Sequence, residues 1–195
     1  MKGTRMAGVY RSVVILLLLC AAPACNESKE HPVAPTPATP APTSGPRILL
    51  AGQSNALRLR DCCMTDAITV IAISSVIYWQ RSPEFAAASR NPDLIALVWW
   101  QGAGDTLTPY DEYVTRLRDV IAIARTSNPE LRVRIIELPD SPDRLTVRAA
   151  QHEVASDPGV ELIPTNDLPT ADAAGHYALS SYQVVRERIY RSLGR

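Results

Sequence analysis

The sequence predicts an α/β domain in which a mostly parallel sheet of about five strands lies between two layers of helices, a three-layer α/β/α sandwich. Two observations support this class. Apolar runs rich in β-branched residues alternate with segments of helical periodicity from residue 47 onward. The clearest run, 94–100, is apolar at every position, which is typical of a strand covered on both faces of a parallel sheet.

The expected strands are short runs, most of them bounded by turn residues. The first ends in Gly52 and leads into residues that can start a helix. The second begins at Ala67 and can continue in interrupted form to Tyr78. The five expected strands are 47–52, 67–73, 94–100, 131–138 and 160–163.

Helical signals lie between these runs. Pro83 and the pair Ser141-Pro142 mark helix starts, because proline fits the first helical turn and serine is a good cap. Further along the chain, apolar residues recur every three or four positions, which gives two segments one apolar face each. The expected helices are one that starts after Gly52, followed by 83–88, 110–126, 141–155 and 180–193.

Residues 1–24 predict an export signal rather than part of the fold. Basic residues precede the apolar run 13–19, which is too short to cross a bilayer. Small residues at 22–24 lead to Cys25, a pattern that resembles a bacterial lipoprotein signal in which Cys25 is lipidated. Simple secretion after cleavage at Ala24 is the alternative. The protein is therefore expected in the cell envelope as a membrane-anchored lipoprotein, or otherwise secreted or periplasmic.

Residues 25–46 are rich in proline, alanine and threonine and predict an extended tether before a folded domain over 47–195. Across the whole chain, 20 Lys and Arg residues balance 20 Asp and Glu residues. This balance favours neither nucleic acid nor an anionic membrane surface as a partner. Contact with a membrane is expected only through the lipid anchor.

Two cysteines belong to the domain itself, and they are neighbours, Cys62 and Cys63. Adjacent cysteines rarely form a disulfide because the closed ring is strained, and two ligands do not make a zinc site. A structural or incidental role is therefore expected for this pair.

Candidate functional residues follow the ends of three expected strands. In a parallel α/β domain these ends share one edge of the sheet, where sites form. Ser54 follows the first strand, Gln101 and Gly102 follow the third, and His176 comes after the last. A serine at a strand–helix joint lies beside helix amides that can stabilise an oxyanion, although serine also commonly caps helices.

A serine nucleophile needs a base, and histidine is the usual one. His31 lies in the tether, and His152 lies within an expected helix as a partly exposed surface residue. His176 lies in a glycine-containing loop, and Asp172, four residues earlier, could hold its second ring nitrogen. This spacing equally fits a turn acid and a capping histidine.

Several blocks resemble, in the same order, the SGNH hydrolases: Gly-Gln-Ser-Asn (52–55), Trp-Trp-Gln-Gly-x-x-Asp (99–105) and an Asp/His block before the last helix. The closer similarity is to their sialate O-acetylesterase and acetylxylan esterase branch, the carbohydrate acetylesterases. Val-Arg-Ala-Ala-Gln (147–151) adds to it. This resemblance implies a flavodoxin-like sandwich and chemistry that needs neither a cofactor nor a metal.

By position, the resemblance implies that Ser54 is the nucleophile, His176 the general base and Asp172 the third member of a catalytic triad. The Ser54 amide, Gln101 and Gly102 match the oxyanion hole. These residues together imply attack on an ester carbonyl and an acyl-enzyme intermediate.

Three positions depart from the family's pattern. Ala103 stands where glutamate is usual, and Ser82 stands where a glycine is expected. Asp172 lies four rather than three residues before His176, which leaves Asp167 as an alternative acid.

These features favour a serine esterase that removes acyl groups, most simply acetyl, from carbohydrate esters. The main alternative is a catalytically weak surface lipoprotein that binds glycans on the same fold. Trp99, Trp100 and Tyr177 would then supply a stacking surface, although burial at the strand end is expected for at least one tryptophan. A hydrolase of lipids or simple esters ranks lower, because the sequence contains no long apolar lid.

Overall fold

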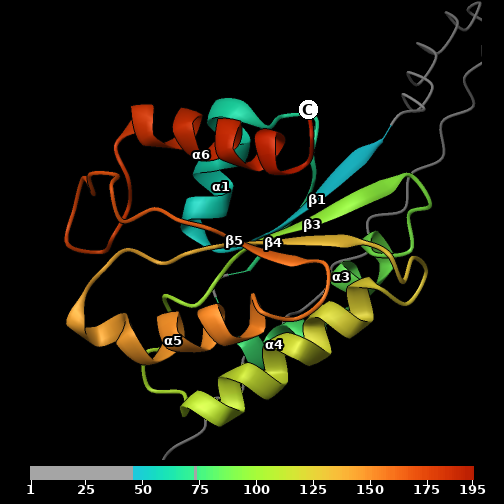
Figure 1. Ribbon diagram of the computed structural model, residues 1–195, viewed down its shortest axis with the longest axis horizontal. Helices are drawn as coiled ribbons and strands as arrows, with labels where there is room; N and C mark the ends of the chain where they lie inside the picture. Colours follow the sequence, from blue (N-terminus) through green and yellow to red (C-terminus); the bar gives the residue numbers. More distant parts are fainter. Residues whose placement is uncertain (1–45, 73) are drawn as a thin grey trace, which may run out of the picture. The chain divides into compact units, whose positions relative to one another are not determined.

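The computed structural model of the chain describes residues 46–72 and 74–195. Its centre is a five-stranded parallel sheet with the strand order β2-β1-β3-β4-β5. Helices cover both faces of this sheet (Figure 1), which confirms the predicted fold class. The strands are β1 (Arg47–Gly52), β2 (Ile68–Ile71), β3 (Leu94–Trp100), β4 (Arg132–Ile136) and β5 (Val160–Ile163).

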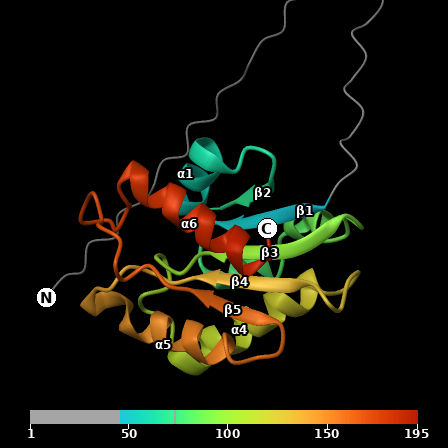
Figure 2. The same cartoon turned by 45° about the horizontal axis from the view of Figure 1, so that its top comes forward.

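The helices form two layers. Helices α1 and α6 pack together on one face of the sheet, whereas α3, α4 and α5 lie on the other (Figure 1). Figure 2 shows the same arrangement after a turn of the molecule. The helices are α1 (Ser54–Cys63), α2 (Val76–Trp79), α3 (Pro83–Ala88), α4 (Tyr110–Ala124), α5 (Leu145–Val154) and α6 (Leu179–Ser192), with a 3-10 turn (Pro142–Arg144) before α5.

The strand order creates a topological switch point between β1 and β3. After β1 the chain moves outward to β2, and after β3 it moves in the opposite direction to β4. The register pairs Gly52 with Trp100, so that β1 and β3 end level with each other. A crevice outside the carboxyl ends of the strands is the usual ligand site at such a point.

Aromatic side chains of β3 fill the core on both sides of the sheet. Trp99 packs edge-on against Trp79 at 5.1 Å between ring centroids, and Trp100 packs against Tyr177 at 5.6 Å. Trp99, Trp100 and Tyr177 are at most 2% exposed. The expected stacking surface is therefore absent from these three residues. Successive side chains of a strand point to opposite faces, and helices cover both faces here.

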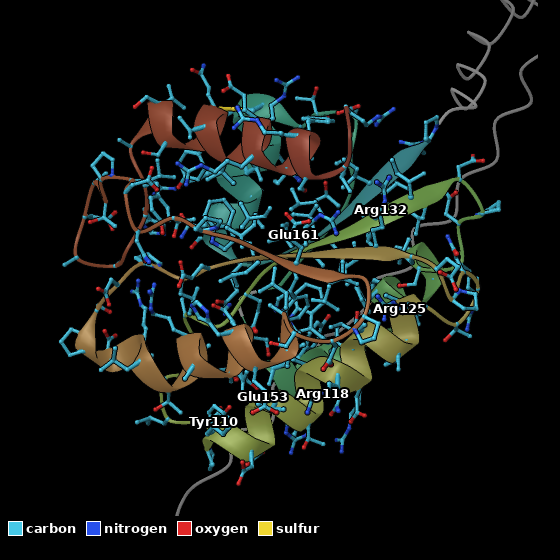
Figure 3. The ribbon with its side chains drawn as sticks, in the orientation of Figure 1. Tyr110, Arg118, Arg125, Arg132, Glu153 and Glu161 are labelled. Carbon is cyan, nitrogen blue, oxygen red and sulfur yellow. A yellow bond between two sulfur atoms is a disulfide. The ribbon has the colours of Figure 1, made fainter. Side chains whose placement is uncertain are left out.

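Polar contacts join α4 to α5 at their outer surface. Arg118 donates to Glu153 at 3.1 Å and to Asp157 at 2.9 Å, and the hydroxyl of Tyr110 donates to Glu153. Figure 3 shows Tyr110, Arg118 and Glu153 gathered where the two helices meet. Ion pairs this exposed contribute at most about 1 kcal/mol each, so they support the scaffold only modestly.

Three of the expected strands have the predicted bounds, whereas the second and the fourth are shorter, the fourth being Arg132–Ile136 instead of 131–138. The second departs most from its prediction. It ends at Ile71, and the segment Val76–Trp79 is a helix, so the expected continuation to Tyr78 is wrong. Valine, isoleucine and aromatic residues favour strands, but strand propensity is weak and tertiary contacts override it.

Cys62 and Cys63 form a disulfide, contrary to the expectation that adjacent cysteines stay unlinked, and the structural role expected for the pair is compatible with it. They are the last two residues of α1, and the chain leaves helical geometry at Met64.

Residues 1–45 and 73 lie outside the described residues. The predicted signal peptide (1–24), the lipidation of Cys25 and nearly all of the tether (25–46) therefore stay predictions. In the part of the chain that the structure describes, no helix is long and apolar enough to cross a membrane.

Candidate active site

Ser54 is placed by a sharp change from strand to helix. A Cβ on Gly52 would lie 2.2 Å from the carbonyl oxygen of Trp100, so only glycine allows β1 and β3 to approach this closely. The N–H of Gln53 donates to the same carbonyl at 3.2 Å, and α1 begins at Ser54. The hydroxyl of Ser54 therefore stands at the carboxyl edge of the sheet, at the switch point.

The hydroxyl contacts an imidazole from the far end of the domain. Oγ of Ser54 lies 2.9 Å from Nε2 of His176, and Nδ1 of His176 lies 2.8 Å from Oδ2 of Asp172. Because the carboxylate can only accept, Nδ1 carries the proton and Nε2 accepts from the serine. Ser54 does not cap its helix, since Gln53 is the N-cap residue.

Hydrogen bonds from His176 keep Asp172 ionised. The imidazole of His176 and the backbone N–H of His176, the latter at 3.0 Å from Oδ1 of Asp172, both donate to this carboxylate and hold the pKa of Asp172 below its ordinary value. The positive charge of Arg58 lowers this pKa further. The side chain of His176 is 19% exposed, whereas that of Asp172 is 43% exposed. The imidazole is thus sheltered, with its acid on the solvent side.

A small hairpin accommodates the extra residue between the acid and the histidine. We call residues 170–177 the His176 loop. Thr170 and Tyr177 form an antiparallel bridge, and the N–H of Ala171 donates to the carbonyl of His176 at 2.6 Å. The loop turns at Gly175, whose φ of +81° is left-handed. Four-residue spacing is therefore compatible with an Asp–His pair.

Asp167, the alternative acid, lies elsewhere. Both of its oxygens accept from Arg188 of α6, and its side chain is 63% exposed. The structure brings Asp172, and not Asp167, to His176.

Two side chains hold the His176 loop from opposite sides. Asn55 donates to the carbonyl of Gly175 at 3.1 Å and accepts from the hydroxyl of Tyr182 at 2.7 Å. Arg144 donates to the carbonyl of Ala174 at 2.8 Å. Sequence analysis assigned no role to Asn55 or Arg144. The sequence did point to Asn55, because this residue directly follows the candidate nucleophile Ser54.

Gln101 is fully buried and its amide is engaged inside the protein. Its Nε2 donates to the carbonyl of Ser74 at 3.1 Å and to the carboxylate of Asp105. Asp105, 1% exposed, also accepts from the N–H of Val76 at 3.0 Å. This network ties the segment after β2 to the segment after β3. The Gln101 side chain is therefore a support of the site rather than a free donor.

Gly102 is held by packing behind the site. A Cβ there would lie 2.8 Å from Cγ1 of Val147 and 3.0 Å from the hydroxyl oxygen of Tyr113. The peptide at Gly102 is therefore fixed in position next to Gln101.

The segment after β2 contributes Ser74, whereas Ser82 does not belong to the site. Ser74 accepts from the amides of Gln101 and also of Gln53, the latter at 2.9 Å. Ser82 caps α3 by accepting from the N–H of Phe85 at 3.1 Å, with an ordinary φ of −72°. Ser74 was not among the predicted site residues because these were sought after the first, third and last strands only.

His152 is a surface residue of α5, as expected. Its Nε2 lies 2.7 Å from Oε1 of Glu137, and its side chain is 57% exposed. Within residues 46–72 and 74–195, no three His, Cys, Asp or Glu side chains are grouped to hold a metal ion.

No protein-family model and no curated protein matches this chain. Solved structures do. A protein from Streptococcus pneumonia, named in relation to platelet activating factor, is 17% identical with a TM-score of 0.61, over 77% of this chain and 85% of that chain. A carbohydrate esterase family 3 protein from Talaromyces cellulolyticus is 12% identical with a TM-score of 0.58, over 75% and 96%.

A peptidoglycan O-acetylesterase is 17% identical with a TM-score of 0.51, over 66% of this chain and 45% of that chain. At identities this low, the structural similarity shows a shared fold and no more. Any function proposed for the chain therefore has to be argued from the contacts of its own residues, described above.

Proposed function

We propose that the chain is a serine esterase that removes acyl groups, most simply acetyl, from carbohydrate esters. The observation that carries this proposal is the hydrogen-bonded series Ser54–His176–Asp172, with 2.9 Å and 2.8 Å between the joined atoms. A serine hydroxyl becomes a nucleophile when an adjacent base takes its proton and a third group orients that base.

In the proposed first step, Oγ of Ser54 attacks the ester carbonyl carbon while Nε2 of His176 takes the hydroxyl proton. The carboxylate of Asp172 accepts the Nδ1–H, which fixes the tautomer and stabilises the imidazolium. The tetrahedral oxyanion then collapses and the bond to the sugar oxygen breaks. The sugar leaves as an alcohol with the proton from Nε2, and the acyl group remains on Ser54.

The second step releases the acyl group. His176 takes a proton from a water molecule, and the oxygen of that water attacks the acyl carbon. The second tetrahedral intermediate collapses, the carboxylic acid leaves, and Ser54 regains its proton from Nε2. Asp172 has the same part in both steps.

Backbone amides are the proposed oxyanion donors. Ser54 and Asn55 lie in the first turn of α1, where N–H groups have no partner within the helix and carry partial positive charge. The fixed peptide at Gly102 is a further contributor on the β3 side. Each such donor typically contributes about 3 kcal/mol to transition-state stabilisation.

Carbohydrate acetyl esters are the proposed substrates for two reasons. The sequence blocks resemble the carbohydrate acetylesterase branch, and structures of similar fold include a carbohydrate esterase and a peptidoglycan O-acetylesterase. O-acetylated sialic acid is one member of this class, suggested by the sequence resemblance alone.

Hydrolysis of p-nitrophenyl acetate by the full chain tests the proposal. Ser54→Ala should lower kcat by at least about 10³-fold, whereas Ser156→Ala, at an exposed site on α5's C-terminal side, should leave it unchanged. A serine-directed phosphonate should label Ser54, as read by mass spectrometry. Hydrolysis that survives in Ser54→Ala would refute the assignment.

The second candidate function is glycan binding with weak catalysis. Two observations favour it: the Gln101 amide is engaged by Ser74 and Asp105, and Ala103 stands where the related family has glutamate. Binding of an acetylated oligosaccharide, without hydrolysis of p-nitrophenyl acetate and without phosphonate labelling, would establish this function instead.

The proposed place of action is the cell envelope, with Cys25 as a lipid anchor. This rests on the pattern of small residues before Cys25. Incorporation of labelled palmitate that is lost in Cys25→Ser would support the anchor, and incorporation that persists in that variant would exclude it.

A further inference from the structure

Three hollows follow one another along the surface of α6, and α1 lines the first two of them as well. The first, of about 360 Å³, is lined among others by Arg58, Cys62 and Tyr177. The second, of about 310 Å³, shares Cys62 with the first. The third, of about 510 Å³, shares Arg186 and Glu187 with the second. Because neighbours share lining residues, the three hollows are adjacent to one another, and we call this row the α1/α6 groove.

The α1/α6 groove begins beside the candidate active site. Tyr177 directly follows His176, and Arg58 lies one helical turn after Ser54. Residues four apart share a helix face, so Ser54, Arg58 and Cys62 follow one another along α1. Helix α6 also starts just after the His176 loop. A molecule with its ester at Ser54 can therefore continue into the groove.

Four arginines and two acids line the α1/α6 groove, so its side chains carry excess positive charge. In the described part of the chain, none of the four arginines forms an ion pair with a carboxylate, and Asp61 pairs with Arg60 outside the groove. The whole chain has equal numbers of basic and acidic residues, but the side chains that line this groove carry a local excess of positive charge. The arginines are Arg58, Arg186, Arg191 and Arg195.

We infer that the α1/α6 groove binds an acidic oligosaccharide, the part of a polymeric substrate that flanks the ester held at Ser54. The inference rests on the proposed function and adds a substrate class to it. Guanidinium groups match carboxylates with two parallel hydrogen bonds, which favours sugars that carry carboxylates. Leu179, 69% exposed, gives the first hollow an apolar surface for the C–H face of a sugar.

The dimensions also favour an oligosaccharide. From Leu179 to Arg191 helix α6 extends about 18 Å, at 1.5 Å per residue. A chain of several sugars follows such a path, whereas a single sugar occupies one hollow. A flat lipid surface contacts protruding side chains but does not fill a row of hollows.

Titration calorimetry with hexagalacturonic acid tests the inference on the full chain. This probe carries a carboxylate on every sugar and no ester, so its binding does not depend on Ser54 chemistry. Arg186→Gln/Arg191→Gln should weaken binding about tenfold at low salt. The matched control is Arg81→Gln/Arg90→Gln, which removes the same charge from exposed sites near α3, on the opposite face of the sheet. It should leave the affinity unchanged.

Three results would overturn the inference. One is an equal loss of affinity in both double variants, which would reflect net charge alone. Another is equally tight binding of neutral xylohexaose. The third is binding to phosphatidylglycerol vesicles that depends on Arg186 and Arg191 while hexagalacturonic acid does not bind. Failure of the proposed esterase function is measured separately, because p-nitrophenyl acetate is too small to occupy the groove.

Discussion

Replacing Gly175 with alanine tests how the His176 loop is held. The φ of +81° alone costs a residue with a Cβ about 1 kcal/mol. The new Cβ would also lie 2.0 Å from Nη1 of Arg144, whose buried guanidinium donates to the carbonyl of Ala174 at 2.8 Å. Displacing that guanidinium breaks a buried hydrogen bond, which adds about 1–3 kcal/mol. The expected loss of unfolding free energy is therefore about 2–4 kcal/mol in total.

Gly194→Ala is the matched control for this substitution. Gly194 also has a left-handed φ, +73°, but an added Cβ would meet no atom within 4 Å. Urea denaturation should give a loss of about 1 kcal/mol or less for Gly194→Ala. Its hydrolysis of p-nitrophenyl acetate should stay at the parental rate, while that of Gly175→Ala falls because the neighbouring His176 moves. Equal losses of stability in the two variants would refute the reasoning.

Three further predictions concern neighbouring contacts. Asn55→Ala should lower kcat for p-nitrophenyl acetate about 10–100-fold with little change in KM, because His176 loses its alignment; an unchanged kcat in steady-state assays would contradict this. Because hydrogen bonds from His176 hold the pKa of Asp172 below its ordinary value of 3.8, its stabilising effect is complete above that pH and is lost as the pH falls further. Unfolding curves of Asp172→Asn should therefore differ from the parent's at neutral pH and converge in strong acid, and a constant difference would count against the contact. Asp105→Asn should cost about 1–3 kcal/mol in thermal unfolding, because an amide N–H can face the N–H of Val76; a loss below about 0.5 kcal/mol would argue that this network is dispensable.

The central strands were predictable because their side chains are buried on both faces. The run 94–100 can be identified as a strand from its own apolar residues, without knowledge of the strands that pair with it, and its bounds match β3. The meeting of Ser54 and His176, 122 residues apart, also followed from one rule, that parallel strands deliver their carboxyl ends to one edge. This rule placed the two segments at one edge, and the resemblance of the sequence blocks to the SGNH hydrolases singled out Ser54 and His176 within them.

Other features depend on contacts that a sequence pattern does not contain. The segment Val76–Trp79 has strand-forming residues, yet it is a helix whose first N–H donates to the buried carboxylate of Asp105, 29 residues away. Asn55 holds a loop 120 residues further along the chain. Local propensity carries no information about partners at such separations, so these roles emerge only from the folded arrangement.

All five strands run in the same direction, so their amino ends lie at one edge of the sheet, the amino pole, and their carboxyl ends at the opposite edge, the carboxyl pole. Arg47 opens β1 at the amino pole, and Ser54 follows its other end at the carboxyl pole. Any segment that precedes Arg47 joins the domain on the side remote from the serine. The first residue of β1 and the hydroxyl of Ser54 therefore lie at opposite edges of the sheet.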